Sequence, residues 1–514
     1  MKKYILFILL GSSLSALAQI PEDVLKYSYY PQSGTARTLA IGGAMGSLGG
    51  DITAAYVNPA GLGNYKTGEF VFTPSYFLNN NKSNFRDSKT VAKDNFLKLG
   101  NIGFVFGASD NNNPRNSQAF SISVAQTANF SNTIRYQGYN NYSSGSEVWA
   151  EEASRSGLDF DGILASPAYA YGTAPATYTY LIDSFTIGNN LLVKGMPEFV
   201  LAQGKALLQQ KEITSSGGMY EIAAGYAHNS GDKLFIGGSI GIPIIDYNNS
   251  TRFTETDTSA DAANNFNYYQ YTDTYSTTGA GINLKLGLIY RPQEHIRLGI
   301  AVHTPTYMFA MKDSRNSNLY ADTENYNGVA TASSTLFTNG QNGESKYTMI
   351  TPWKVLVSGS YVFREVADVR RQKGFITADI EYTGYRNSSF YSANEEPTAD
   401  ENEYYKALNQ VIKGQYKGNF NFRVGGELKF NIIMARLGFA YYTNPYKDKA
   451  LQARRMLLSG GLGYRHKGFF IDVTYVHALN KEADFAYRLA DKQNTFAKIN
   501  QQLGNIAATV GIKF

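Results

Sequence analysis

The sequence predicts an all-β fold: a transmembrane antiparallel β-barrel of about 14 strands, with an N-terminal hatch (plug) inside its lumen. Three observations predict it. Many segments of about ten residues alternate apolar and polar side chains. The connections between them are short and long in turn, and the chain starts with the pattern of a secretory signal peptide. The composition agrees, because 14% of the residues are aromatic and only 17% are charged.

The first residues have the order of an export signal. Lys2 and Lys3 precede the apolar run from Tyr4 to Leu10, and small residues at Ala16 and Ala18 form a cleavage site. We therefore expect residues 1–18 to be a signal peptide. The apolar run is shorter than the roughly 20 residues that a membrane-spanning helix needs. The chain has no cysteine, so neither a lipid anchor on cysteine nor a disulfide is expected.

The period-two alternation is clearest in residues 419–430. Phe420 and Phe422 fall on one face of a strand, and Asn421 and Arg423 fall on the other. A soluble sandwich could show the same pattern in one strand, so the number of such segments matters more. The predicted strands are 68–78, 96–108, 119–135, 219–228, 234–247, 278–291, 296–311, 347–363, 374–386, 419–430, 432–443, 456–465, 468–478 and 506–514.

The connections give an independent indication. Those after even-numbered strands are short: 109–118, 229–233, 292–295, 364–373, 431 and 466–467. Those after odd-numbered strands are long: 79–95, 136–218, 248–277, 312–346, 387–418, 444–455 and 479–505. Short periplasmic turns and long extracellular loops are typical of outer-membrane barrels, whereas a soluble sandwich has no reason to sort loops by side. The barrel is therefore assigned to residues 68–514, with its largest loop at 136–218.

The last predicted strand ends the chain on an aromatic residue, Phe514. Such an ending resembles the signal by which the outer-membrane barrel assembly machinery recognises its clients. Charged residues within the strands are expected to face the lumen, since Lys or Arg facing lipid at the midplane costs roughly 2 to 4 kcal/mol. These residues are Glu221, Lys285, Arg291, Asp379, Glu381, Arg423, Glu427, Arg436, Arg465 and Asp472.

Residues 19–67 show no strand alternation and are rich in Gly and Ala. A barrel of this size leaves an open channel unless something fills it, so this segment is the predicted hatch. It contains Gly42-Gly43-Ala44, Asp51, and Asn58-Pro59-Ala60-Gly61-Leu62. Asn58-Pro59 forces an extended or turn conformation.

These motifs resemble the hatch of the FadL and toluene-transporter family of outer-membrane proteins. Tyr361-Val362-Phe363, Asp379-Ile380-Glu381-Tyr382 and Gly461-Leu462-Gly463-Tyr464 read like divergent, Bacteroidetes-type members of that family. The resemblance covers the mature chain in architecture and rests in motif mainly on Asn58, Pro59 and Ala60. It implies transport of hydrophobic small molecules such as long-chain fatty acids or aromatic hydrocarbons. Extracellular loops would capture the molecule, and a hatch gated at Asn58, Pro59, Ala60 and Gly61 would let it pass.

One outer-loop segment is a candidate capture surface. Residues 196–213 have helical propensity, with Phe199, Val200 and Leu207 near one another at helical spacing. Packing of this helix on the barrel rim is the alternative. Residues 404–412 and 485–503 are also expected to form short helices. The expected partners are a hydrophobic ligand, outer-membrane lipids and the barrel assembly machinery.

No catalytic, metal or cofactor site is expected. The five histidines form no metal-spaced pair, and the Gly-rich stretch 42–50 lacks the strand, lysine and helix of a phosphate-binding loop. The spread of basic residues does not indicate nucleic-acid binding. A general porin, a surface-loop adhesin and a barrel enzyme remain as alternatives, and the cargo could be a fatty acid, an aromatic hydrocarbon, haem or a host lipid.

Overall fold

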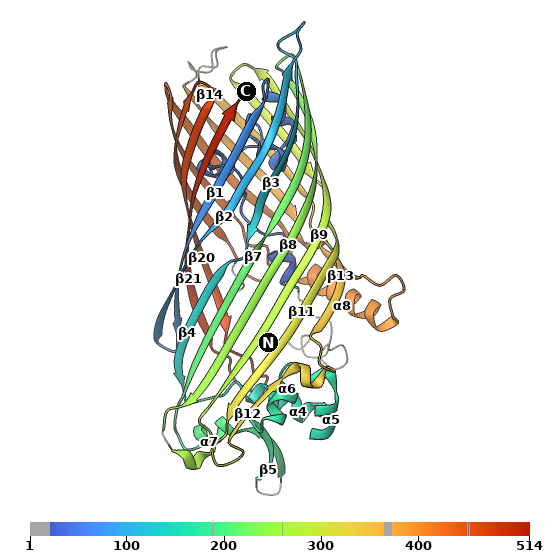
Figure 1. The fold of residues 1–514 in the computed structure, drawn as a ribbon, viewed down its shortest axis with the longest axis vertical. Coiled ribbons are helices and arrows are strands. Elements are labelled where there is room, and N and C mark those ends of the chain that lie inside the picture. Colours follow the sequence, from blue (N-terminus) through green and yellow to red (C-terminus); the bar gives the residue numbers. More distant parts are fainter. Residues whose placement is uncertain (1–20, 188–189, 260, 364–372, 450, 452) are drawn as a thin grey trace.

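The computed structural model describes residues 21–187, 190–259, 261–363, 373–449, 451 and 453–514. The predicted signal peptide therefore lies outside the described residues. The described part confirms the predicted fold class, a closed antiparallel barrel of 14 strands (Figure 1). Closure comes from pairing of the first strand, β1, with the last, β21, from Glu69↔Lys513 onward.

Ten of the barrel strands are continuous and four are made of two pieces each. The continuous strands are β1 (Glu69–Phe85), β2 (Ser88–Ser109), β7 (Leu207–Ser230), β8 (Leu234–Asp257), β9 (Tyr268–Gln293), β17 (Gly418–Phe430), β18 (Ile433–Tyr442), β19 (Arg455–His466), β20 (Phe469–Phe485) and β21 (Phe496–Lys513). The composite strands are β3 with β4 (Ser117–Asn129, Asn132–Asn140), β10 with β11 (Ile296–His303, Tyr307–Asp322), β13 with β14 (Gly343–Ile350, Lys354–Phe363) and β15 with β16 (Gly374–Gly384, Ser389–Ser392).

Two of the breaks coincide with proline. Pro305 separates β10 from β11, and Pro352 separates β13 from β14. Proline has no backbone N–H to donate to the ladder, so it interrupts a strand. The two breaks lie side by side, because His303 pairs with Lys354 before them and Tyr307 pairs with Ile350 after them.

Outward side chains form a broad apolar band at the end of the barrel where the chain terminates. Leu437 is 75% exposed and Leu462 is 63% exposed, although both are large and apolar. At the far edge of this band, Trp353, Tyr382 and Phe420 pack in a row, with ring centroids 5.3 and 5.1 Å apart. An apolar band bordered by aromatic side chains is the surface that faces lipid in transmembrane barrels.

The short connections are confirmed wherever they are described, because β7 and β8, β9 and β10, β17 and β18, and β19 and β20 follow each other almost directly. The predicted long loops are partly wrong. Residues 79–95 are strand apart from the turn at Arg86 and Asp87, and residues 207–218, 246–257 and 268–277 are also strand. Their outward side chains are mostly polar since they lie beyond the apolar band, and this hides the alternation. The barrel is therefore much taller than the sequence indicated.

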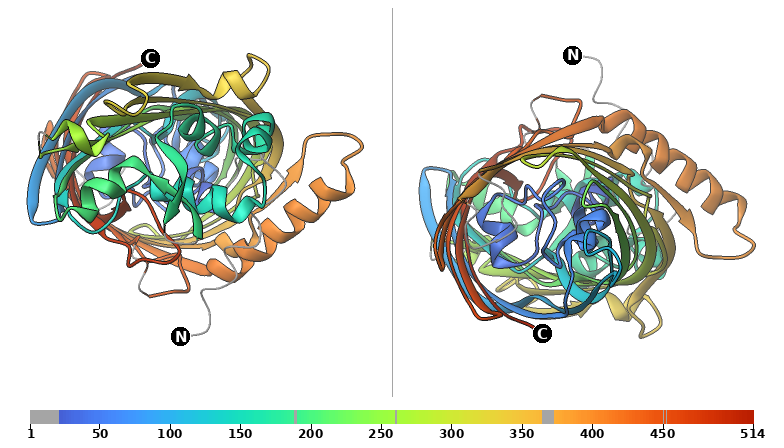
Figure 2. Two further views of the ribbon diagram at one scale, coloured as in Figure 1. Left: turned by 90° about the horizontal axis from the view of Figure 1, so that it is seen from below. Right: turned by 90° about the horizontal axis from the view of Figure 1, so that it is seen from above.

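The predicted helix 404–412 is confirmed within α8 (Ala399–Gln415), which projects sideways from the barrel (Figures 1 and 2). The predicted helix 196–213 is wrong beyond α7 (Met196–Ala202), because Gly204 adopts a left-handed φ of 74° and β7 starts at Leu207. The predicted helix 485–503 is also wrong, since β21 starts at Phe496. Among the described residues, no helix is long and apolar enough to cross a membrane.

Candidate functional site

Residues 21–65 lie inside the barrel, toward the end with the short turns (Figure 2). They contain the short helices α1 (Asp23–Lys26), α2 (Ala36–Ala40) and α3 (Ala54–Val57) and the 3-10 helix η2 (Pro59–Asn64). Thr35 caps α2 and Asn58 caps η2, since each side chain accepts a hydrogen bond from a backbone N–H in the first turn. We call residues 34–65 the hatch and residues 21–32 the N-terminal segment.

Asn58 links the hatch to the barrel wall. Its Nδ2 atom lies 2.6 Å from the carbonyl of Gly46 in the hatch, and 3.3 and 3.4 Å from the carbonyls of Leu288 and Ile300 in β9 and β10. Its Oδ1 atom accepts from the N–H of Ala60 at 3.2 Å. Asn58 is 1% exposed, so a lost bond would leave buried polar groups unpaired.

Inward-facing glycines let the hatch backbone touch the wall. A Cβ atom on Gly237 of β8 would lie 2.6 Å from the backbone of Pro59, and one on Gly107 of β2 would lie 2.7 Å from that of Tyr65. Eight glycines on eight strands lie against the hatch. Those against its backbone are Gly107, Gly237, Gly299, Gly425 and Gly438, and those against its side chains are Gly225, Gly287 and Gly461. This interlocking holds the hatch in place and leaves it little freedom to tilt.

Eight of the ten charged residues predicted to face the lumen are buried there, and Arg291 and Arg465 are partly buried. Arg436 bonds Glu427 at 2.6 Å and Asp472 at 2.5 Å, and Arg423 bonds Glu381 at 3.0 Å. Lys285 bonds Glu221, Arg291 donates to Asn64 of the hatch, and Asp379 accepts from the N–H of Gly46 at 3.2 Å. The prediction of a polar, ion-paired interior is thus confirmed, and these pairs also serve to seat the hatch.

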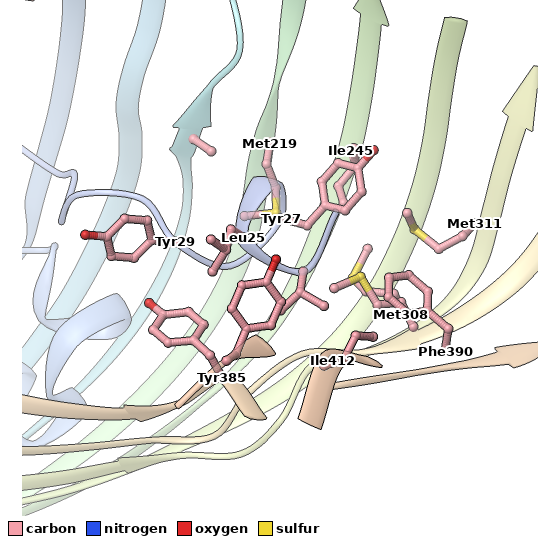
Figure 3. Packing of buried hydrophobic residues seen from close by; sticks show 14 of the residues in the cluster. Leu25, Tyr27, Tyr29, Met219, Ile245, Met308, Met311, Tyr385, Phe390 and Ile412 are labelled. Carbon is pink, nitrogen blue, oxygen red and sulfur yellow. The ribbon is translucent and has the colours of Figure 1, made fainter. Parts of the chain in front are cut away.

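Between the hatch and the opposite mouth of the barrel lies a buried cluster rich in methionine and tyrosine, which we call the Met–Tyr cluster (Figure 3). It joins α1, the inner faces of several strands and the base of α8. Its buried members are Val24, Leu25, Tyr27, Tyr29, Ala128, Met219, Ile245, Met308, Met311, Tyr347, Met349, Tyr385, Phe390, Tyr405, Leu408, Ile412, Tyr416, Ala440 and Tyr442. Methionine adapts to differently shaped apolar partners, so the packing of this buried cluster can adjust.

Aromatic and cationic side chains tether the N-terminal segment. The Lys26 Nζ atom lies 4.6 Å from the ring centroid of Tyr247. In two further contacts, the barrel supplies the cation and the N-terminal segment supplies the ring. Arg455 lies 4.7 Å from the ring of Tyr29, and Lys354 lies 5.2 Å from the ring of Tyr30. The segment is therefore held mainly by side chains, whereas the hatch is also held through its backbone.

The other mouth of the barrel is covered by residues 141–206, which we call the cap (Figure 2). The cap contains α4 (Glu147–Ser156), α5 (Phe160–Ala165), α6 (Thr173–Tyr178), α7 and the hairpin of β5 (Ile182–Ile187) and β6 (Asn190–Gly195). Of the candidate capture residues, Val200 and Leu207 are fully buried between cap and barrel. Phe199 is partly buried and packs edge-to-face on Phe185 at 4.8 Å.

Several apolar side chains that the outer surface exposes were not predicted from the sequence. Leu191 of the cap hairpin is 72% exposed, and Leu336 and Val329 in the connection after β11 are each 60% exposed. Tyr178 and Tyr180 of the cap are about half exposed. No periodic pattern could have revealed them, because they lie at turns and element ends.

A buried carboxylate fastens the cap to the rim. Glu255 of β8 accepts hydrogen bonds from Ser144, from the N–H of Gly145 at 2.9 Å and from Gln209 at 2.5 Å. It lies beyond the apolar band, whose last outward residue on β8 is Ile244. Burial raises the pKa of Glu255 from 4.5 to about 7. Since the folded state favours the protonated form, this group makes the cap less stable as pH rises from 4.5 to about 7.

Two apolar grooves, of about 660 and 990 Å³, lie on the outer wall rather than in the lumen. Ile376, Leu437 and Tyr475 line both grooves. Gly426 and Gly460 form the floor of the grooves, because they have no side chain to fill them. These grooves lie within the apolar band, where lipid chains would fill them.

The described residues contain no group of three or more His, Asp or Glu side chains that could hold a metal ion. His303 Nε2 donates to the carbonyl of Val57 at 2.9 Å, which makes it a hatch contact. His477 contacts Tyr475 on the outer wall. Both histidines thus have partners within the chain.

No family model and no curated protein matches the sequence. Solved structures match over nearly the whole chain. A Pseudomonas aeruginosa FadL homologue has a TM-score of 0.53 at 13% identity, and the P. putida toluene transporter TodX has a TM-score of 0.53 at 12% identity. Each alignment covers 94% of this chain and 99% of the other. The fold is that of the FadL-type barrels.

Proposed function

We propose that the protein passes hydrophobic small molecules across the outer membrane of a Gram-negative bacterium. The observation that carries the proposal is the Met–Tyr cluster, an apolar region enclosed between hatch and cap in a FadL-type barrel. A general porin would need an open aqueous lumen, and the interlocked hatch argues against one. The resemblance suggests long-chain fatty acids or aromatic hydrocarbons as cargo and a Bacteroidetes-type lineage.

Capture would occur at the cap. The exposed side chains of Leu191, Tyr178 and Tyr180 are available to a lipophile at once. Phe199 is partly available, whereas Val200 and Leu207 become available only when the cap separates from the rim. Opening of the cap would thus lead the molecule from an exposed apolar surface to a buried one.

Release would require the hatch to move, with Asn58, Pro59, Ala60 and Gly61 as the gating residues. Asn58 bonds both hatch and wall, so it couples their positions. For barrel assembly, we propose that Phe514 is the recognition signal. It is 65% exposed, and its backbone pairs with Gly68, next to the start of β1, at 2.8 and 3.0 Å.

Mass spectrometry of an organic extract tests the proposal. The protein and an unrelated barrel are purified identically in mild detergent and extracted. A discrete lipophile enriched in stoichiometric amount with this protein supports transport and names the cargo class. If no lipophile is enriched and the protein admits small sugars into liposomes, the protein is a porin and the hatch has a structural role alone.

A further inference from the structure

The Lys26 ammonium group of α1 lies in an aromatic cage. Its Nζ atom is 4.6 Å from the ring centroid of Tyr247, 5.5 Å from that of Tyr275 and 5.4 Å from that of Tyr27. The Asp23 carboxylate bonds it at 2.5 Å. Rings of this kind attract a cation through the negative faces of their π systems, and several rings around an ammonium group are the usual way to recognise an organic cation.

Two of the three rings of this cage belong to the barrel and would remain if α1 moved away. Tyr247 is on β8 and Tyr275 is on β9. Asp313 of β11 adds a buried carboxylate, which acts electrostatically on Lys26 and accepts hydrogen bonds from Thr277 at 2.8 Å and Tyr347 at 3.2 Å.

The cage adjoins an apolar region. Tyr347, which donates to Asp313, is itself a member of the Met–Tyr cluster, together with Met308 and Met311. From α1, Val24 and Leu25 enter that cluster, and Figure 3 shows Leu25 there. The helix therefore presents to the barrel a compact apolar surface and an ammonium group that it pairs with its own Asp23, and without that carboxylate this is the chemistry of an amphipathic amine.

The helix α1 is attached to the barrel by contacts that allow it to leave and return. The helix has four residues and no side-chain cap at its N-terminus. Beyond the cage, the N-terminal segment reaches the barrel through hydrogen bonds such as Tyr416 to the carbonyl of Pro21, at 2.9 Å. Short isolated helices are unstable in water, so α1 would unfold once it left this site.

We propose that the barrel has a binding site for an amphipathic cation, formed by Tyr247, Tyr275, Asp313 and the barrel residues of the Met–Tyr cluster, and that α1 occupies it as an internal stand-in. This inference rests on the proposed function and narrows the cargo to apolar molecules that carry an amine or quaternary ammonium group. This cargo class differs from the fatty acids and aromatic hydrocarbons that the resemblance suggests. Binding of the ligand and seating of α1 exclude each other.

The absence of cysteine makes displacement of α1 directly measurable. In L25C, the introduced thiol is the single one in the chain, and Leu25 is 9% exposed. The full-length variant in lipid nanodiscs is labelled with a maleimide in the presence of decyltrimethylammonium, decanoate or decanol, which share one alkyl length. We expect decyltrimethylammonium to accelerate labelling severalfold and the other two to have little effect.

Affinity for the same probes, measured by calorimetry, provides the second readout. D23N/K26M removes the internal cation together with the carboxylate that pairs with it. We expect it to raise the affinity for decyltrimethylammonium about tenfold, because a desolvated cation–π contact no longer competes. K354M is the matched control. In that contact, the cation of Lys354 belongs to the barrel and the ring of Tyr30 belongs to the N-terminal segment. Loss of the Lys354 cation therefore loosens the segment without emptying the cage.

The outcomes separate the two hypotheses. Equal binding of the three probes, or labelling of L25C that does not respond to the cation, overturns the cation site but leaves the proposed function standing. Binding of none of the probes counts against both. A rise in cation affinity in K354M equal to that in D23N/K26M means that loosening of the segment, and not the cage, sets the affinity, and it overturns the cation site as well.

Discussion

Replacement of Asn58 by alanine should loosen the hatch while leaving the barrel intact. The substitution removes the 2.6 Å bond to Gly46, the 3.2 Å bond from Ala60 and two longer contacts to the carbonyls of Leu288 and Ile300. The bonds to Gly46 and Ala60 lie within the hatch, so only the two contacts to Leu288 and Ile300 oppose its displacement. A net loss of about 1 kcal/mol for each gives about 2 kcal/mol. That energy raises the ratio of displaced to seated hatch about thirtyfold.

Single-channel recording in planar bilayers measures this ratio as the fraction of time that the barrel conducts ions. N81A is the matched control, because Asn81 of β1 is also fully buried and donates two bonds of 2.6 Å, to Asn132 and Thr133, but it lies far from the hatch. We expect N58A to conduct far more often than the wild type and N81A to behave like the wild type. If N58A folds normally and conducts no more than N81A, the reasoning that Asn58 seats the hatch is refuted.

Three further predictions concern the hatch contacts, the cap and assembly. In G237V, the new side chain overlaps the hatch backbone, so ion leakage should rise, whereas G359V, which points into open space, should leave conductance unchanged. The cap should lose stability, on the order of 3 kcal/mol, as pH rises from 4.5 to about 7, the pKa of Glu255. Hydrogen exchange in residues 141–147, corrected for intrinsic rates, should become faster over this range. Equal protection at both ends of the range, or the same response in E255Q, would exclude this role. F514A should reduce the yield of assembled barrel more than F430A, which removes a similarly exposed phenylalanine at another strand end, and equal yields would argue against the signal.

The sequence predicted the number of strands and their order because membrane lipid imposes a strict requirement on every second residue. Within the apolar band the alternation is regular, as in Phe420 and Phe422. Beyond the band, water accepts either polar or apolar outward side chains. The strand residues at 79–85 and 246–257 therefore read as loops, and the length of the strands could not be inferred.

The hatch was predictable as a segment, whereas its contacts were not. Asn58 stood out through its motif, but its partners in β9 and β10 depend on the register of strands more than 200 residues away. The inward glycines at 237 and 438 looked like any strand glycine in the sequence, and only the folded barrel places them against the hatch. The cage around Lys26 combines residues from α1, β8 and β9 and has no sequence signature.

The strands that rise beyond the apolar band determine where a molecule first meets the protein. On β8, the stretch from Asp246 to Asp257 extends about 40 Å at 3.3 Å per residue, or roughly 30 Å along the axis for a strand tilt near 40°. The cap is carried at that height. We call the strand segments beyond the apolar band the collar. In the proposed outer membrane, the carbohydrate coat of the outer leaflet would surround the collar. A water-insoluble molecule that enters at the cap would then bypass the sugars that otherwise slow its approach to the lipid. Shortening the collar without altering its register would lower the entrance into that coat and slow uptake even though every binding residue is retained.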